Sequence, residues 1–158
     1  MQNKRFSPFV SSKNSIGKVM LDVIIALLPL CAFAFYTYRN WFLIVLGSAL
    51  GGAILTEILF SGIFLKKWKG ILDGSAIITV LLLVFTISPL TPWYVAAFGG
   101  SCAVLFGKIL WGGVGKNKFN PALVGREFMT VFFPLVMSSF VARKFQSFLV
   151  ISEKMVWF

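Results

Sequence analysis

Residues 74–107 read GSAIITVLLLVFTISPLTPWYVAAFGGSCAVLFG, and none of these side chains is charged. As one α-helix this stretch would be about 50 Å long, at about 1.5 Å per residue. The hydrocarbon core of a bilayer is only about 30 Å thick, so one helix would overshoot it. The segment Ser88-Pro89-Leu90-Thr91-Pro92 supplies a break, because proline removes a backbone donor and disfavours helix in the residue before it. The stretch therefore predicts two membrane spans joined by a tight turn.

The whole chain has the composition of an integral membrane protein. Its 158 residues are 58% hydrophobic and 13% charged, and the mean hydropathy is +0.89. Soluble domains carry about 25% charged residues. The net charge of +10 does not indicate a nucleic-acid-binding protein, because the basic residues lie at the ends of apolar segments rather than on one amphipathic surface.

No set of side chains predicts a metal site. Histidine is absent, which excludes histidine metal sites and imidazole acid–base chemistry. Cys31 and Cys102 lie in separate apolar segments without CxxC spacing, so they predict neither a disulfide framework nor a complete iron–sulfur site. We interpret both cysteines as small packing residues.

Five apolar segments predict an all-α membrane domain over residues 19–140. We expect the spans at residues 19–38, 41–65, 75–87, 93–111 and 121–140. The third is short, as in a re-entrant or broken helix. Trp93 and Trp111 at the ends of the fourth are typical interfacial anchors. Gly47 and Gly51 form a GxxxG pair in the second, a common helix-contact pattern.

The distribution of basic residues predicts the orientation. Four lie in residues 1–18, three follow the second span and two lie in the loop after the fourth, which Lys108 flanks, whereas the loop after the first has only Arg39. Positively charged loops stay in the cytoplasm. We therefore expect residues 1–18 to form a cytoplasmic tail and residues 141–158 an external segment. An odd number of spans is typical of one half of an inverted repeat, since two such halves insert with opposite orientation.

Glu57 is an acidic residue inside the second predicted span. A carboxylate at the centre of a bilayer costs about 3 kcal/mol or more and normally faces an interior or a wet cavity. Glu57 is therefore either a ligand or relay for a cation, or a structural acid that snorkels to the interface or lies protonated in a helix contact. Asp22 and Asp73 lie near span ends beside lysines, which indicates interfacial charge balance. Arg126 and Glu127 indicate a local charge pair or a partner contact rather than catalysis.

A glycine-rich loop, GGVGKNKFN at residues 112–120, precedes the fifth span. Successive backbone amides can bind anions, but the loop does not match the Walker pattern. Two interpretations stay open: a ligand loop in which Asn117 and Asn120 hydrogen-bond an anion or a planar heterocycle, and a tight interhelical turn.

Several motifs together resemble one known family. The elements are DGSA at residues 73–76, PLTPW at 89–93, FGK at 106–108 and GGVGKNKFNPALVGR at 112–126. They are similar to the signature region of the RnfD/NqrB family, the flavin-carrying membrane subunits of the Rnf complex and of sodium-pumping NADH:quinone oxidoreductase. The segments SPFVSS at 7–12 and VMLDVIIALLP at 19–29 resemble the RnfD branch. The resemblance covers about residues 7–140.

The resemblance implies a fold like that of the urea and ammonium transporters, with two inverted halves. It implies FMN linked to a threonine in an S-G-A-T-like motif, which residues 1–158 lack. It matches Asn117 and Asn120 to a pair that the NqrB branch associates with riboflavin, and Glu57 to an acid that this branch links to cation movement. It also implies the bacterial inner membrane and other Rnf or Nqr subunits as partners.

We therefore expect a membrane subunit of an Rnf-type complex, or its N-terminal half. In such a complex electrons pass between reduced ferredoxin and NAD, and ion movement is coupled to that transfer. We expect the chain to be a truncated product, a separately encoded half or a fragment, without catalysis of its own. Sodium and proton both stay open as the coupling ion. The alternatives are a passive channel or transporter half on the same scaffold, and a non-functional remnant.

Overall fold

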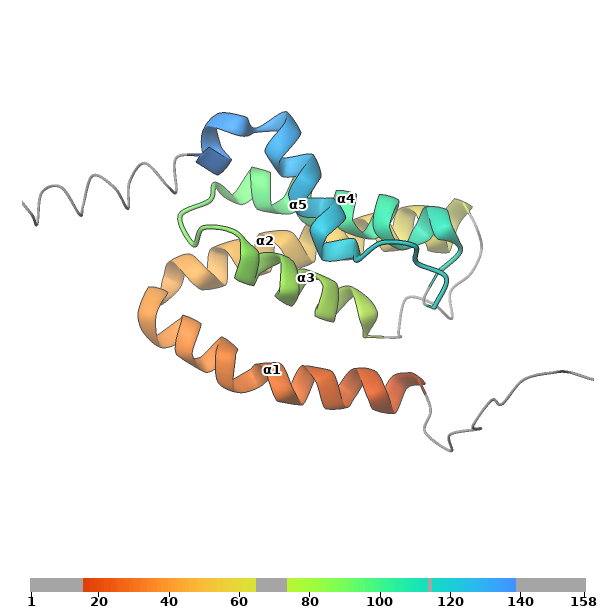
Figure 1. Ribbon diagram of the computed structural model, residues 1–158, viewed down its shortest axis with the longest axis horizontal. Coiled ribbons are helices and arrows are strands. Elements are labelled where there is room, and N and C mark those ends of the chain that lie inside the picture. Colours follow the sequence, from red (N-terminus) through yellow and green to blue (C-terminus); the bar gives the residue numbers. More distant parts are fainter. Residues whose placement is uncertain (1–15, 65–73, 114, 139–158) are drawn as a thin grey trace, which may run out of the picture.

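The computed structural model describes residues 16–64, 74–113 and 115–138, and these residues form helices joined by turns (Figure 1). The elements in chain order are α1 (Ile16–Tyr38), α2 (Asn40–Thr56), the π-helix η1 (Glu57–Phe64), α3 (Ser75–Thr86), α4 (Trp93–Gly107), the 3-10 turn η3 (Ile109–Trp111) and α5 (Pro121–Phe132). The predicted all-α class is confirmed for this part of the chain. The predicted external segment at residues 141–158 and nearly all of the tail at 1–18 lie outside the described residues.

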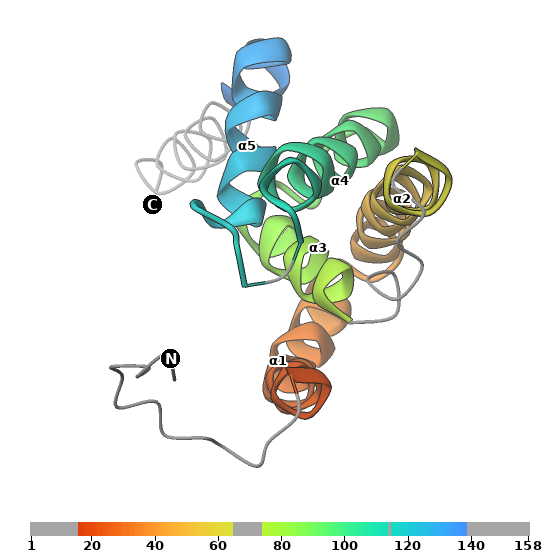
Figure 2. The same cartoon turned by 90° about the vertical axis from the view of Figure 1, so that its right-hand side faces the viewer.

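Helix α4 lies at the centre of the bundle, between α2 and α5 and against α3 (Figure 2). Helices α2 and α4 run in the same direction and contact each other, and α3, which connects them in the chain, runs in the opposite direction against both (Figures 1 and 2). Helix α1 contacts α2 and α3 at the edge, and none of its described side chains is fully buried. Helix α1 changes direction along its length (Figure 1), and it contains Pro29, which removes a helix hydrogen bond.

Three helical segments are long and apolar enough to cross a membrane: Gly17–Tyr38, Asn40–Phe60 and Trp93–Trp111. They support the predicted integral membrane protein. Helices α3 and α5 have only 12 residues each. At about 1.5 Å per residue each is about 18 Å long, well short of a core about 30 Å thick. The count of five full spans therefore stays a prediction.

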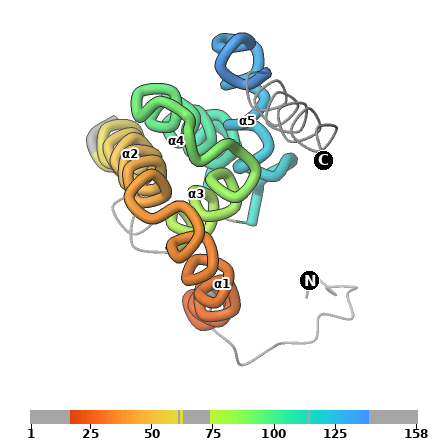
Figure 3. Tube along the Cα trace, turned by 90° about the vertical axis from the view of Figure 1, so that its left-hand side faces the viewer, coloured from red at the N-terminus to blue at the C-terminus, as the bar shows by residue number. Residues whose placement is uncertain are grey.

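The turn between α3 and α4 has the form predicted from its two prolines. Helix α3 ends at Thr86, and Ile87 is extended at φ −110° and ψ 166°. Thr91 N–H donates to the carbonyl of Ser88 at 3.0 Å, and α4 begins at Trp93 directly after Pro92. Figure 3 shows this turn at the end of the bundle where α1 also passes into α2.

The predicted fifth span over residues 121–140 is not one regular helix in the part of it that the structure describes. Helix α5 begins at Pro121 and ends at Phe132, and Phe133 leaves the helical region at φ −129° and ψ 55°. Pro134 explains the break, because proline disfavours the helical conformation in the residue before it. A short helical stretch follows at residues 134–138.

The contact between α2 and α4 is made by backbone rather than by side chains. A Cβ added at Gly52 would lie 2.2 Å from the carbonyl oxygen of Ala97, and one added at Gly100 would lie 2.2 Å from that of Ala49. Such approaches are typical of membrane helices with small residues at their interface. The GxxxG pair predicted to make a helix contact does not make it: a Cβ at Gly47 or Gly51 would meet nothing within 4 Å among the described residues.

This packing predicts opposite outcomes for two glycine substitutions in α2. Gly52→Ala should destabilise the protein by about 1–3 kcal/mol, because the methyl group must push two backbones apart. Gly47→Ala should be neutral or stabilising by up to about 1 kcal/mol, because alanine favours helix over glycine and the site is open. Thermal denaturation of both variants in the same detergent checks this. Equal losses in the two variants would contradict the assigned interface.

Candidate functional site

The site is a buried ion pair in the seam between α2 and α4. Lys108 Nζ donates a hydrogen bond to Glu57 Oε1, and the two groups form a salt bridge. The side chains are only 6% and 2% exposed, respectively. Glu57 therefore faces the protein interior rather than the lipid interface.

Both residues lie where a regular α-helix ends. Glu57 is the first residue of the π-helix η1, and its backbone N–H is shared between the carbonyls of Ala53 and Ile54. Lys108 follows the last residue of α4, at φ −119° and ψ −59°, and η3 begins directly after it. Single π-helical turns occur often at functional sites, and η1 extends this geometry over 8 residues from Glu57. The irregular backbone thus marks the same two residues as the ion pair.

The pair lies at the end of the bundle where the predicted ligand loop also lies. Since α2 and α4 run in parallel, their final residues share one end, and α5 begins there too (Figure 2). A Cβ at Gly107 would lie 2.5 Å from the Cα of Pro121, so the start of α5 is in backbone contact with the residue before Lys108. The loop at residues 112–120 connects these two points.

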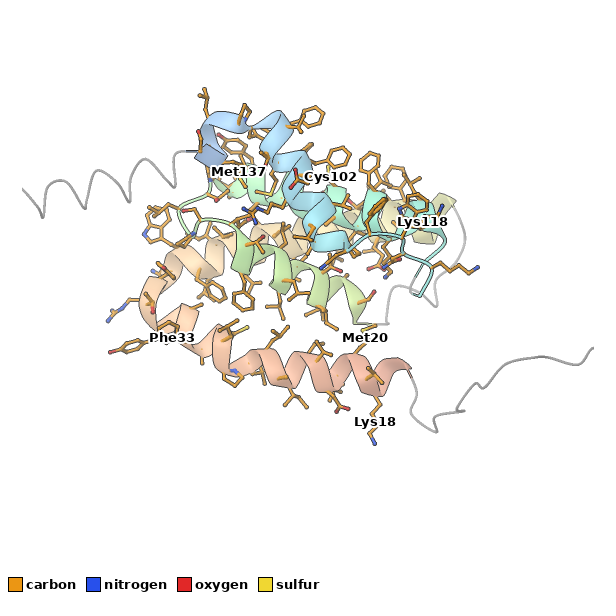
Figure 4. All side chains as sticks on the ribbon, viewed as in Figure 1. Lys18, Met20, Phe33, Cys102, Lys118 and Met137 are labelled. Carbon is orange, nitrogen blue, oxygen red and sulfur yellow. The ribbon has the colours of Figure 1, made fainter. Side chains whose placement is uncertain are left out.

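The contacts of this loop support a tight interhelical turn. Gly112, Gly113 and Gly115 have φ values of 93°, 101° and 83°, a left-handed conformation that only glycine adopts at little cost. Lys118 Nζ lies 4.8 Å from the centre of the Trp111 ring, which ties the loop back to η3 (Figure 4).

The two predicted flavin ligands are both exposed in this loop. Asn120 Oδ1 accepts a hydrogen bond from Ala122 N–H at 3.1 Å, so this side chain caps α5. Asn117 and Asn120 as contacts of a flavin stay a prediction.

The other two acids that the structure describes, Asp22 and Glu127, are not brought to the pair. Asp22 is exposed on α1, and Arg126 and Glu127 are exposed on α5. In the ranges that the structure describes, Arg126 and Glu127 form no ion pair with each other. Asp73 lies outside the described residues. Both cysteines are free thiols; Cys102 is buried in α4 and Cys31 is half-buried on α1.

A run of aromatic rings joins α4 to α5 on the other side of α4. Phe106 stacks on Phe128 with ring centres 4.5 Å apart, and Phe128 stacks on Phe132 at 6.2 Å. Phe98 contacts both Phe132 and Phe133 edge-on, each at 5.4 Å. Such pairs stabilise by about 0.5–1.5 kcal/mol beyond their buried area. They fix α5 against α4 and so hold the start of α5 beside the pair.

The sequence comparison decides the family. The model of the NQR2, RnfD, RnfE family matches residues 3–153 of the chain. The chain belongs to this family. The resemblance predicted from the motifs is therefore confirmed.

Relatives of this chain are named as D subunits of ion-translocating oxidoreductase complexes. The D subunit of the ion-translocating oxidoreductase complex of Stutzerimonas stutzeri is 36% identical over 128 residues, which cover 80% of this chain and 36% of that protein. The protein of the same name in Haemophilus influenzae (strain PittGG) is 39% identical over 138 residues, covering 85% and 38%. The D subunit of the Na(+)-translocating ferredoxin:NAD(+) oxidoreductase complex of Acetobacterium woodii is 35% identical over 133 residues, covering 84% and 42%. The chain thus spans less than half of the length of each of these relatives.

Sequence reasoning identified Glu57 but missed Lys108 as its partner. Lys108 is the one lysine within the fourth predicted span, residues 93–111. From its position in the sequence we interpret it only as a charge that flanks the loop after that span. A lysine inside a span needs a partner just as an acid does. That shared requirement is the signal that could have paired the two residues.

The pair predicts a compensating double substitution. Lys108→Met should destabilise the protein by about 3–5 kcal/mol, because it leaves a buried carboxylate without its counter-charge. Glu57→Gln should cost less, since the amide oxygen still accepts a hydrogen bond from the ammonium. The double variant should recover most of the loss seen in Lys108→Met, as measured by thermal denaturation. Additive losses would show that the two charges are not coupled.

Proposed function

We propose that this chain supplies the N-terminal membrane part of an RnfD subunit in an ion-translocating oxidoreductase complex of the Rnf type. Membership of the NQR2, RnfD, RnfE family and the three long apolar helices support this proposal. The relatives named after such complexes are longer proteins, and the residues they share with this chain cover most of it. In the proposed complex the partners are the other Rnf subunits, and electron transfer between ferredoxin and NAD drives ion movement.

The observation that carries the ion-transport role is the buried Glu57–Lys108 pair. Replacing a buried ion pair by apolar residues is often neutral or stabilising, so such a pair contributes little to stability as a whole. Ionisable residues inside membrane helices typically mark ion pathways or relays. Glu57 is proposed as an acid of the ion path, with sodium or a proton as the transported ion.

The flavin part of the proposal assigns FMN to the RnfD subunit as a whole rather than to this segment. The cofactor would supply the redox chemistry, and the protein would bind and orient it. The exposed amide of Asn117 on the loop at residues 112–120 is available to a flavin, riboflavin or FMN, whereas Asn120 would have to bind it while capping α5.

The proposed topology places the N-terminus in the cytoplasm. The loop at residues 112–120, with Lys116 and Lys118, lies at the same end of the bundle as the start of α1 (Figure 1). Residues with positive charge are retained on the cytoplasmic side. This end, which also holds the ion pair, is then the cytoplasmic end.

Ion uptake by the assembled complex tests the role of Glu57. Glu57→Gln keeps the shape of the side chain and removes its charge, so NADH- or ferredoxin-driven ion uptake into reconstituted vesicles should fall several-fold. Assembly and flavin content should persist. The matched control is Glu127→Gln, the same chemical change on the exposed face of α5. Unchanged uptake in a normally assembled Glu57→Gln complex would leave Glu57 a structural residue.

The threonines of this segment predict that it carries no covalent FMN. None of the six described threonines follows an S-G-A pattern. Four of their hydroxyls donate to a backbone carbonyl three or four residues earlier: Thr37, Thr56, Thr86 and Thr130. In-gel flavin fluorescence of the denatured chain should show no band. A fluorescent band, with mass spectrometry placing FMN on one of these threonines, would contradict this.

A further inference from the structure

We propose that Lys108 is a tethered counter-ion, whose ammonium occupies the place of the transported cation beside Glu57 and leaves when that cation binds. The inference rests on the proposed role of Glu57 in the ion path. It adds that the Lys108 ammonium competes with the transported cation for the Glu57 carboxylate. The ligand class is a monovalent metal cation, for which sodium is the probe.

Charge balance in the α2–α4 seam motivates this inference. Glu57 and Lys108 are both almost fully buried, and together they carry no net charge. A monovalent cation that joins them would leave one uncompensated positive charge in a medium that solvates charge poorly. The balance is restored when the ammonium moves away. A divalent cation would still leave a net positive charge after that exchange.

Lys108 is placed so that its side chain can move while its backbone stays fixed. Gly107 is in backbone contact with Pro121, which holds this point of α4 against α5. The lysine stem has four carbons and carries a compact charge on rotatable bonds. It extends from the C-terminal end of α4, where the negative end of the helix dipole stabilises a cation. The displaced ammonium thus has a second favourable position near the end of the bundle.

The carbonyl oxygens of the last turn of α2 are candidate further ligands for an incoming cation. Those of Ala53 and Ile54 share a single N–H, that of Glu57. A carbonyl oxygen has two lone pairs, so it can accept this hydrogen bond and still coordinate a cation. The hydroxyl of Thr56 donates to the carbonyl of Gly52 at 2.8 Å, and its oxygen keeps two lone pairs. The carboxylate together with backbone oxygens suits sodium, which prefers oxygen ligands.

Two substitutions at Lys108 should shift the sodium dependence of transport in opposite directions. In Lys108→Gln the competitor is gone, so the sodium concentration for half-maximal uptake should fall several-fold. In Lys108→Arg the guanidinium holds the carboxylate through two hydrogen bonds, so that concentration should rise several-fold. Lys116→Gln, on the exposed loop, is the matched control and should match the wild type. The measurement is driven uptake of labelled sodium by vesicles with the full complex.

A merely structural lysine would lower the maximal rate in both variants without moving the half-maximal concentrations apart. That result, or a wild-type complex without any sodium dependence, would overturn the inference. If Glu57→Gln lowers sodium uptake while the two lysine variants keep the wild-type dependence, only the inference fails. If Glu57→Gln has no effect either, the proposed role of Glu57 fails first.

Thermal stability provides a second readout that needs no turnover. Sodium should raise the unfolding midpoint of the Lys108→Gln complex more than that of the wild type, because the cation replaces the missing counter-charge. Choline chloride at the same concentration controls for ionic strength. Equal shifts in both proteins would contradict the exchange. If the Lys108→Gln complex does not assemble, the test rests on Lys108→Arg. A half-maximal sodium concentration that is unchanged from the wild type in that variant overturns the inference.

Discussion

The structure depends on how closely the backbones of α2 and α4 approach each other. In a bilayer the lipid is as apolar as the side chains, so small residues that permit close packing determine which helices associate. Here Gly52 and Gly100 admit carbonyl oxygens into the space that a Cβ would fill. This contact sets the register of two parallel helices. Ala49 and Gly100 touch at a sequence separation of 51 residues, and Glu57 and Lys108 pair at the same separation. The same alignment of α2 and α4 that brings Ala49 to Gly100 therefore also brings Glu57 to Lys108.

The sequence was informative wherever a local rule decides the outcome. Two prolines within an uncharged stretch predicted the turn between α3 and α4, and the apolar segments predicted the helices on either side. Pro134 likewise determines where α5 ends, although the apolar segment at residues 121–140 continues past it. The buried position of Glu57 agreed with the cost of a charge in lipid. Each of these conclusions needs only the properties of a residue and its immediate neighbours.

The sequence was not informative where two distant segments must be aligned. Helix α2 is apolar on all sides, so its pattern does not show which face meets α4, and Gly47 and Gly51 were as plausible a contact as Ala49 and Gly52. The partner of Glu57 depends on the same alignment, because α2 and α4 are in contact in space while α3 lies between them in the sequence. A local pattern cannot supply that register. Membrane helices lack the amphipathic contrast that reveals the inner face of helices in soluble proteins.

The separation of the pair along the chain has a consequence for biogenesis. Glu57 emerges from the ribosome 51 residues ahead of Lys108. At about 5–20 residues per second, synthesis of that segment takes several seconds. During this interval the carboxylate waits in or near the translocation channel without its counter-charge. The apolar length of Asn40–Phe60 must therefore carry the acid into the membrane first, and the folded seam closes only when α4 arrives.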